Sequence, residues 1–189
     1  MIKHRQFFRD IAKFKNILNL EDNSLLNKIH LNHRLSYLRD TAIGRFIEEM
    51  TIKHINVMMH YNNSDIIQYF LNNRSFLKKI IDKILENDTE KKNEGILFLL
   101  ELITCCKDLM NTKYYFYESL CDLNVIEALE KTLIDVTHYS SYNKYLKSLK
   151  EDKLKDEDLT NEENLKNEKI KINAIEILIN VLTAVPSKK

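Results

Sequence analysis

Apolar residues recur every three or four positions along most of the chain, and short polar breaks separate the apolar segments. This spacing places apolar side chains on one face of a helix, because an α-helix turns once in about 3.6 residues. The pattern predicts successive helices, approximately over residues 2–18, 24–49, 52–61, 66–71, 76–86, 89–110, 112–124, 125–137 and 173–183.

The polar breaks are interpreted as helix caps rather than as catalytic loops. Residues 63–65 (Asn-Ser-Asp) precede one predicted helix, and Thr51, Ser75 and Asp88 precede others. Side-chain oxygens at such positions accept hydrogen bonds from the N–H groups that the first turn of a helix leaves unpaired. Asn124 closes the helix before it. The breaks therefore predict a protein built from short stacked helices.

Glycine and proline are scarce: the 189 residues include two glycines and one proline. Nucleotide-binding α/β folds, sandwiches and barrels use more glycine, because their tight turns need positive φ angles. The composition therefore favours an all-α protein of one ordinary domain, residues 1–189.

The charge balance, the apolar runs and the cysteines limit the expected partners and the expected compartment. The 29 basic residues nearly balance the 28 acidic ones, so neither nucleic acid nor an anionic membrane is an expected partner. No apolar run approaches the roughly 20 residues of a transmembrane helix, and the first residues do not resemble a signal peptide. Cys105 and Cys106 are expected to be small core residues of a protein from a reducing, intracellular compartment.

The series of helices also repeats along the chain. A slide of 49 residues places Ile67 on Phe116, with further apolar matches after it. A slide of 79 residues then places EGILFLLELIT on NAIEILINVLT, with Leu100 on Ile179. A unit of a short, a medium and a long apolar helix is typical of armadillo and HEAT repeats.

These matches predict an armadillo/HEAT-like, right-handed α-solenoid of about three helical repeats. Two copies cover residues 64–111 and 112–187, and a degenerate copy precedes them. Small residues at Gly95 and Ala174 fit a point where helices approach closely.

An insertion interrupts the second copy. The two slides differ by 30 residues, which we assign to residues 139–168. The leucines of this highly charged segment are not spaced to form one helix face. We expect an inserted, charged, low-complexity loop that is mobile and is cleaved first in limited proteolysis.

Several stretches resemble the SMEK domain, the armadillo-like central region of the protein phosphatase 4 regulatory subunit 3 family. The similar stretches, in the family's order, are LNHRLSYLRDTAIGRFIEEM, MMHYNNSDIIQYFLNNRSFLKKI, NVIEALEKTLI and AVPSKK. His60 stands where the family has an aromatic residue, and the inserted segment is absent from the family pattern. The family's PH-like domain and acidic tail have no counterpart in this sequence.

The resemblance implies a non-catalytic regulatory or scaffold subunit. Its partners would be proteins, namely the catalytic or a bridging subunit of a phosphatase 4-type complex, or substrates recruited to it. Metal ions and chemistry would belong to the catalytic partner, so no cofactor is expected. The family also implies residence in the nucleus and cytoplasm, and we expect the chain to be monomeric.

No residue cluster predicts a catalytic or metal site. His30 and His33 are three residues apart, as in some metal pairs, but no third ligand has a suitable spacing. Cys105 and Cys106 point about 100° apart on a helix and cannot chelate together. The aromatic run 114–117 is better explained by a buried solenoid helix than by a base-stacking platform, because no basic groove accompanies it.

A polar ladder on the two long apolar helices is the candidate partner-binding groove. In armadillo stacks the third helices line the concave face, where a peptide or protein docks. Ordinary solvation of an exposed helix face explains the same pattern. The candidate residues are Glu94, Leu97, Glu101, Thr104 and Asp108 on the first helix, and Asn173, Glu176, Asn180 and Thr183 on the second.

Two other functions remain open on the sequence alone. One is an α-solenoid adaptor unrelated to the phosphatase family. The other is a helical metalloenzyme that uses His30 and His33.

Overall fold

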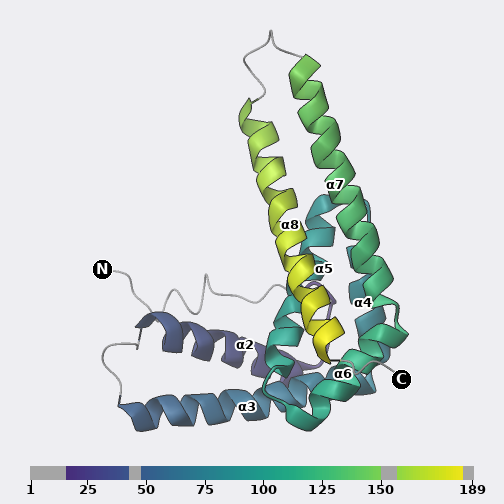
Figure 1. Ribbon diagram of the computed structural model, residues 1–189. Helices are drawn as coiled ribbons and strands as arrows, with labels where there is room; N and C mark the ends of the chain where they lie inside the picture. The colour runs from purple at the N-terminus through teal and green to yellow at the C-terminus, as the bar shows by residue number, and fades with distance from the viewer. Residues whose placement is uncertain (1–15, 43–47, 150–156, 185–189) are drawn as a thin grey trace. The chain divides into compact units, whose positions relative to one another are not determined.

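The computed structural model describes residues 16–42, 48–149 and 157–184, and side chains are not described at 41–42 and 139–163 (Figure 1). Every regular element in these ranges is helical, which confirms the all-α prediction. The predicted first helix, 2–18, lies almost wholly outside the described residues. The elements are α2 (Asn23–Tyr37), a π-helical turn η1 (Leu38–Ala42), α3 (Glu49–Asn72), α4 (Arg74–Ile84), α5 (Thr89–Cys106), α6 (Met110–Asp122), α7 (Val125–Leu149) and α8 (Glu157–Ala184).

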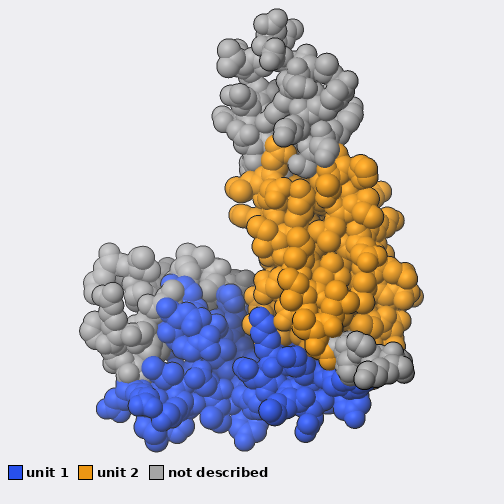
Figure 2. All heavy atoms as spheres, viewed as in Figure 1, with its two compact units in different colours: residues 1–74, 105–116 blue, residues 75–104, 117–189 orange. Residues whose placement is uncertain are grey.

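The chain divides into two compact units (Figure 2). Unit 1 comprises residues 1–74 and 105–116, and unit 2 comprises residues 75–104 and 117–189. No helix in the described ranges is long and apolar enough to cross a membrane.

Several helix ends follow the predicted capping chemistry. Asp22 Oδ1 accepts hydrogen bonds from the backbone N–H groups of Ser24 and Leu25 at 2.8 and 3.1 Å and starts α2. Asp88 Oδ1 accepts from the N–H of Glu90 at 2.9 Å at the start of α5. Asn124 has φ of 60° in the turn between α6 and α7, a left-handed conformation that asparagine tolerates.

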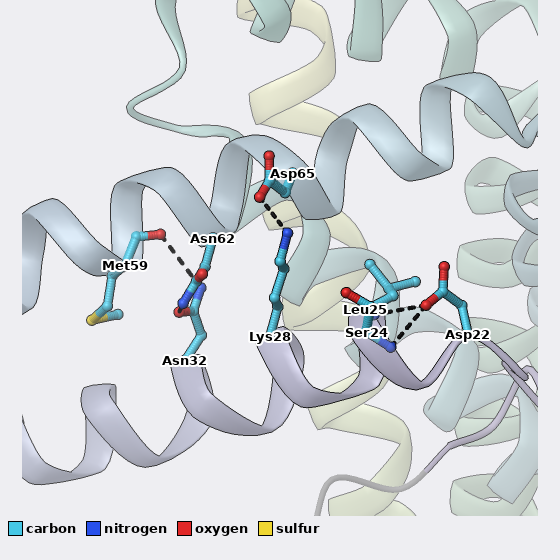
Figure 3. A network of polar contacts seen from close by, with 8 residues as sticks. All are labelled: Asp22, Ser24, Leu25, Lys28, Asn32, Met59, Asn62 and Asp65. Atoms are coloured by element: carbon cyan, nitrogen blue, oxygen red, sulfur yellow. Dashed lines mark hydrogen bonds and ion pairs between the residues drawn. The ribbon is translucent and has the colours of Figure 1, made fainter.

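A buried asparagine cluster joins α2 to α3 in unit 1 (Figure 3). Asn32 donates to Asn63 Oδ1 at 2.6 Å. It also accepts a hydrogen bond from Asn62 Nδ2 at 2.9 Å. Lys28 of α2 also forms an ion pair with Asp65 of α3. Because Asn32 is buried, the loss of one partner would leave an unpaired amide in the core. The cluster therefore fixes the register between the two helices.

This cluster also explains why the predicted break at residues 63–65 is wrong. Helix α3 continues without interruption from Glu49 to Asn72. The side chains of Asn62 and Asn63 bond to Asn32 on the neighbouring helix instead of capping a new one. Thr51 and Ser75 are likewise not caps, because α3 already begins after Glu48 and α4 already begins at Arg74.

Unit 2 contains a close approach between α4 and α5 at Gly95. A Cβ atom added there would lie 3.1 Å from Ile84 Cγ1 and 3.2 Å from the Ile84 backbone nitrogen. These distances are shorter than ordinary van der Waals contacts, so the absence of a side chain allows the two helices to pack closely. The prediction of a close approach at Gly95 is confirmed.

The prediction of a loop over residues 139–168 is wrong, because the described parts of this segment are helical. Helix α7 continues to Leu149 and α8 begins at Glu157, and the two helices contact each other along a long hairpin (Figure 1). Lysine, glutamate and leucine are strong helix formers, so a polar segment without one apolar face can still be helical. Residues 150–156 lie outside the described residues, and the mobility of the segment stays a prediction.

The buried residues of the two predicted copies do match, but the number of residues between matched positions is one smaller than in the predicted slides of 49 and 79. Buried residues of α4 match buried residues of α7 at 48 residues, and those of α5 match α8 at 78 residues. The expected equivalence of Leu100 and Ile179 is therefore wrong: Leu100 is half-buried and Ile179 is 57% exposed. The matched buried pairs are Leu77–Val125, Ile80–Ala128, Ile81–Leu129, Ile84–Thr132, Ile96–Ala174, Leu99–Ile177 and Ile103–Val181.

Candidate functional site

The predicted ladder residues of α5 lie on its outward face. Glu101 and Thr104 are exposed, Leu97 is 44% exposed and Glu94 is half-buried. The Thr104 hydroxyl donates to the Leu100 carbonyl at 2.9 Å, within its own helix. These residues belong to unit 2 and form what we call the α5 face. Asp108 is exposed too, but it follows the end of α5 and belongs to unit 1.

The predicted ladder residues of α8 lie beside its most exposed positions rather than on them. Asn173, Glu176 and Asn180 are half-buried, and only Thr183 is exposed. Asn180 Nδ2 donates to the Glu176 carbonyl at 2.7 Å, and the Thr183 hydroxyl donates to the Ile179 carbonyl at 2.7 Å. The Asn180 and Thr183 side chains are thus hydrogen-bonded to backbone carbonyls of their own helix.

Five exposed positions of α8 are aliphatic. We call this set the α8 stripe; its members are 47–62% exposed and are Leu165, Ile172, Ile175, Ile179 and Leu182. The stripe was not predicted, because the slide of 79 residues places Ile179 on Leu100, which the apolar pattern assigns to the core. The spacing of three and four residues from 172 to 182 was the available signal.

A polar recess lies where α5, α7 and α8 meet inside unit 2. Its volume is about 250 Å³, and Lys92 and Asn167 in its lining are only 6% and 4% exposed. Lys92 Nζ lies 3.4 Å from Asp135 Oδ2, so this buried ammonium has a carboxylate partner. A lining with polar groups and charges of both signs suits water or a small polar group better than an apolar cofactor.

The histidine pair of α2 has no third ligand within the part of the chain that the structure describes. No group of three His, Cys, Asp or Glu residues there could hold a metal ion. His33 is exposed and His30 is half-buried. Burial, followed by the positive charges of Arg34 and His33, lowers the pKa of His30. His30 is therefore mainly neutral near pH 7.

Burial raises the pKa values of two cysteine thiols, Cys106 and Cys121. Burial raises the pKa of Cys106 to about 12. Burial, followed by the charges of Asp122 and Glu118, raises the pKa of Cys121. At neutral pH both remain protonated, which makes them poor nucleophiles and poor ligands. The expectation of a core role is confirmed for Cys106, whose side chain is fully buried.

The aromatic run of α6 is divided between two environments. Phe116 and Tyr117 are fully buried, whereas Tyr114 and Tyr115 are exposed and contact each other edge to face at 5.8 Å between ring centroids. The run is thus only partly the buried helix that the sequence predicted.

The sequence is similar to one protein family and to several known proteins. The family model described as "Phosphatase 4 regulatory subunit 3" matches residues 1–188. Suppressor of Mek1 from Dictyostelium discoideum is 30% identical over 137 residues, which is 71% of this chain and 13% of the relative. An uncharacterized protein of Schizosaccharomyces pombe is 29% identical over 67% of this chain and 16% of its own length.

Serine/threonine-protein phosphatase 4 regulatory subunit 3 from Drosophila melanogaster is 27% identical over 70% of this chain and 14% of its own length. The chain thus spans between 13% and 16% of the curated relatives that it matches. No solved structure matches it.

Proposed function

The chain belongs to the phosphatase 4 regulatory subunit 3 family, and from that premise we propose that it is a non-catalytic regulatory or scaffold subunit of a phosphatase 4-type complex. The observation that carries this proposal is the match of the family model over residues 1–188. The chain contacts a catalytic or bridging subunit and helps to position substrates. Metal ions and hydrolysis belong to the catalytic subunit, so this chain needs no cofactor.

The proposed architecture is an armadillo-like, right-handed solenoid. Recurring burial supports it: Ile66, Ile67 and Phe70 of α3 are buried, as are the α6 residues 50 positions further on. The same holds for α4 with α7 and for α5 with α8. A stack of equivalent helices leaves one outward face on each long helix, available to a partner.

The α5 face is the proposed contact for the phosphatase subunit. It presents the carboxylates of Glu94 and Glu101 beside the exposed aliphatic side chain of Leu97. Mixed acidic and apolar surface suits a partner that offers basic groups around an apolar contact. Within unit 2, the predicted groove also includes Asn173, Glu176, Asn180 and Thr183 of α8.

Recovery of a purified phosphatase 4-type catalytic subunit by the tagged chain tests the proposal. We expect the wild type to recover the subunit and Glu101→Lys/Thr104→Lys to recover about tenfold less or worse, because added lysines oppose a basic partner. The matched control is Glu127→Lys/Glu130→Lys on α7, which also changes two exposed residues three positions apart. Circular dichroism checks that all three proteins have equal helix content.

Each alternative outcome contradicts a different part of the proposal. Equal recovery by wild type and α5 variant contradicts the α5 face as the contact. No recovery by the wild type, from the catalytic subunit alone or with a bridging subunit, contradicts the regulatory role for this chain.

We also propose residence in both nucleus and cytoplasm, and a monomer in the absence of partners. Imaging of the fluorescently tagged chain checks the first point, and sedimentation of the purified chain checks the second. Exclusion of the tagged chain from the nucleus would contradict the proposed distribution.

A further inference from the structure

Two buried polar groups line the recess between α5, α7 and α8. The Lys92 side chain of α5 is 8% exposed, and Asn167 of α8 is 4% exposed. A buried ammonium or carboxamide that lacks hydrogen bonds costs free energy, so such groups normally have partners in the working protein. The partners of Lys92 and Asn167 therefore indicate what the recess binds.

Neither buried group uses all its hydrogen-bonding capacity on the described residues. The Lys92 ammonium has three N–H donors, and its one side-chain bond goes to Asp135 Oδ2 at 3.4 Å. Hydrogen bonds from an ammonium to a carboxylate are typically about 2.7–2.9 Å long, so this pair is loose. The Asn167 carboxamide has two N–H donors and forms no side-chain hydrogen bond to any residue in the described ranges. The buried part of the lining thus offers unused donors.

The charge of the lining is positive on balance. Lys92 and Lys131 contribute two positive charges, and Asp135 contributes one negative charge. Charges interact most strongly where water is excluded, whereas solvent and salt screen exposed charges. The Lys92 side chain is buried, but the Asp135 side chain is 49% exposed. The buried ammonium therefore dominates the electrostatic potential inside the recess.

Charged residues outside the lining do not reverse this sign. Four of them form two ion pairs that are neutral in sum, Lys91–Glu86 at 3.1 Å and Lys166–Glu90 at 3.9 Å. The Asp88 carboxylate already accepts hydrogen bonds from the first turn of α5, whose partial positive charge offsets its own. Glu127 lies one turn before Lys131 on α7, but it is exposed and is screened by solvent.

We propose that the recess binds a small oxyanion, a phosphate or carboxylate group, through the Lys92 ammonium and the Asn167 carboxamide. An oxyanion has several acceptor oxygens and a negative charge, and both complement the unused donors. The recess volume of about 250 Å³ is that of roughly eight water molecules in the liquid, which accommodates one such group and a few attached atoms. The half-exposed Asp135 side chain turns toward solvent when the oxyanion takes its place beside Lys92.

This inference goes beyond the proposed function, because it involves neither the α5 face nor a phosphatase subunit. Its test uses the purified 189-residue chain with inorganic phosphate or with acetate, at constant ionic strength and neutral pH. Two-dimensional NMR of the isotope-labelled chain follows the side-chain amide signal of Asn167 during each titration. The Asn167→Leu variant identifies this signal by its loss.

Two lysine variants show whether binding depends on the recess or on charge in general. Lys92→Met removes the buried ammonium and keeps an unbranched side chain, and the half-exposed Asp135 stays hydrated. The matched control is Lys91→Met, the same substitution at the next residue, whose side chain is 52% exposed and is not part of the lining. If Lys92→Met loses helix content, calorimetric titration of Asn167→Leu replaces it, since leucine has a similar volume and no donors.

We expect both anions to shift the Asn167 signal to saturation in the wild type and in Lys91→Met, with equal affinity. Lys92→Met should bind about tenfold more weakly or worse, and Asn167→Leu about fivefold more weakly, because a hydrogen bond to a charged group contributes more than a neutral one. Tighter binding of phosphate assigns the site to a phosphate group, and tighter binding of acetate assigns it to a carboxylate. A shift that saturates with neither anion would overturn the site. Equal weakening in both lysine variants, or unchanged binding in Lys92→Met, would overturn it too.

Discussion

Helices α5 and α8 have equivalent core faces and opposite outward chemistry. Ile96, Leu99 and Ile103 of α5 are buried, as are the α8 residues 78 positions further on. Most outward positions at the same offset differ: Glu101 on α5 corresponds to Ile179 on α8, and Thr104 corresponds to Leu182. The exception is Leu97, which corresponds to Ile175. The core face of each helix is determined by the fold. The outward face is free to vary, so its chemistry reports what covers the helix.

The largest expected effect is on the free energy of unfolding, and it differs between the two faces of α8. Ile177→Ala removes a fully buried side chain and should lower the free energy of unfolding by about 2–5 kcal/mol, as should Leu99→Ala on α5. Ile179→Ala changes an exposed residue of the stripe and should cost no more than about 0.5 kcal/mol. Urea denaturation followed by circular dichroism measures all three. An Ile179→Ala cost equal to that of Ile177→Ala would show that the stripe is packed inside the isolated chain.

A smaller effect is expected where α5 approaches α4. Gly95→Ala puts a Cβ atom 3.2 Å from the Ile84 backbone nitrogen, and the strain should outweigh the helix propensity that alanine adds, about 1 kcal/mol. We expect a net loss of about 1 kcal/mol, whereas Asn173→Ala at the equivalent position of α8 should be near neutral. Thermal unfolding measures both. A stabilised Gly95→Ala protein would mean that α4 and α5 can separate without cost.

The smallest effect concerns the last residue of α5 and leaves stability unchanged. Because burial raises the pKa of Cys106 to about 12, its reactive thiolate is scarce at pH 8. Burial also blocks reagents, so iodoacetamide should modify the half-buried Cys105 well before Cys106. Mass spectrometry of peptides from the folded protein measures the two rates, with urea-unfolded protein as the control. Equal rates in the folded protein would show that this end of α5 opens readily.

The sequence predicted the fold class and the chemistry of α5 better than that of α8. Few glycines and a helical apolar period were enough for the all-α prediction, and the capping oxygen of Asp88 lies where the pattern places it. The register of α8 was one residue wrong because both of its faces are aliphatic. A slide of either 78 or 79 residues therefore matches apolar residues to apolar residues.

Two other features depend on partners that are distant in the sequence. Asn62 and Asn63 look like a helix break unless their hydrogen bonds to Asn32, about 30 residues earlier, are known. Lys92 looks like a surface residue, yet it is buried beside Asp135, 43 residues later. Local pattern carries no information on such pairings, because they arise only when helices pack.

Site-specific photocrosslinking tests most directly the claim that the outward face of α5, and not that of α8, contacts the phosphatase subunit. A benzoylphenylalanine group replaces Glu101 in one protein and Ile179 in another, and each protein receives the phosphatase 4-type catalytic subunit. We predict that position 101 crosslinks the phosphatase subunit and that position 179 does not. Crosslinks from both positions, or from neither position, would contradict the account.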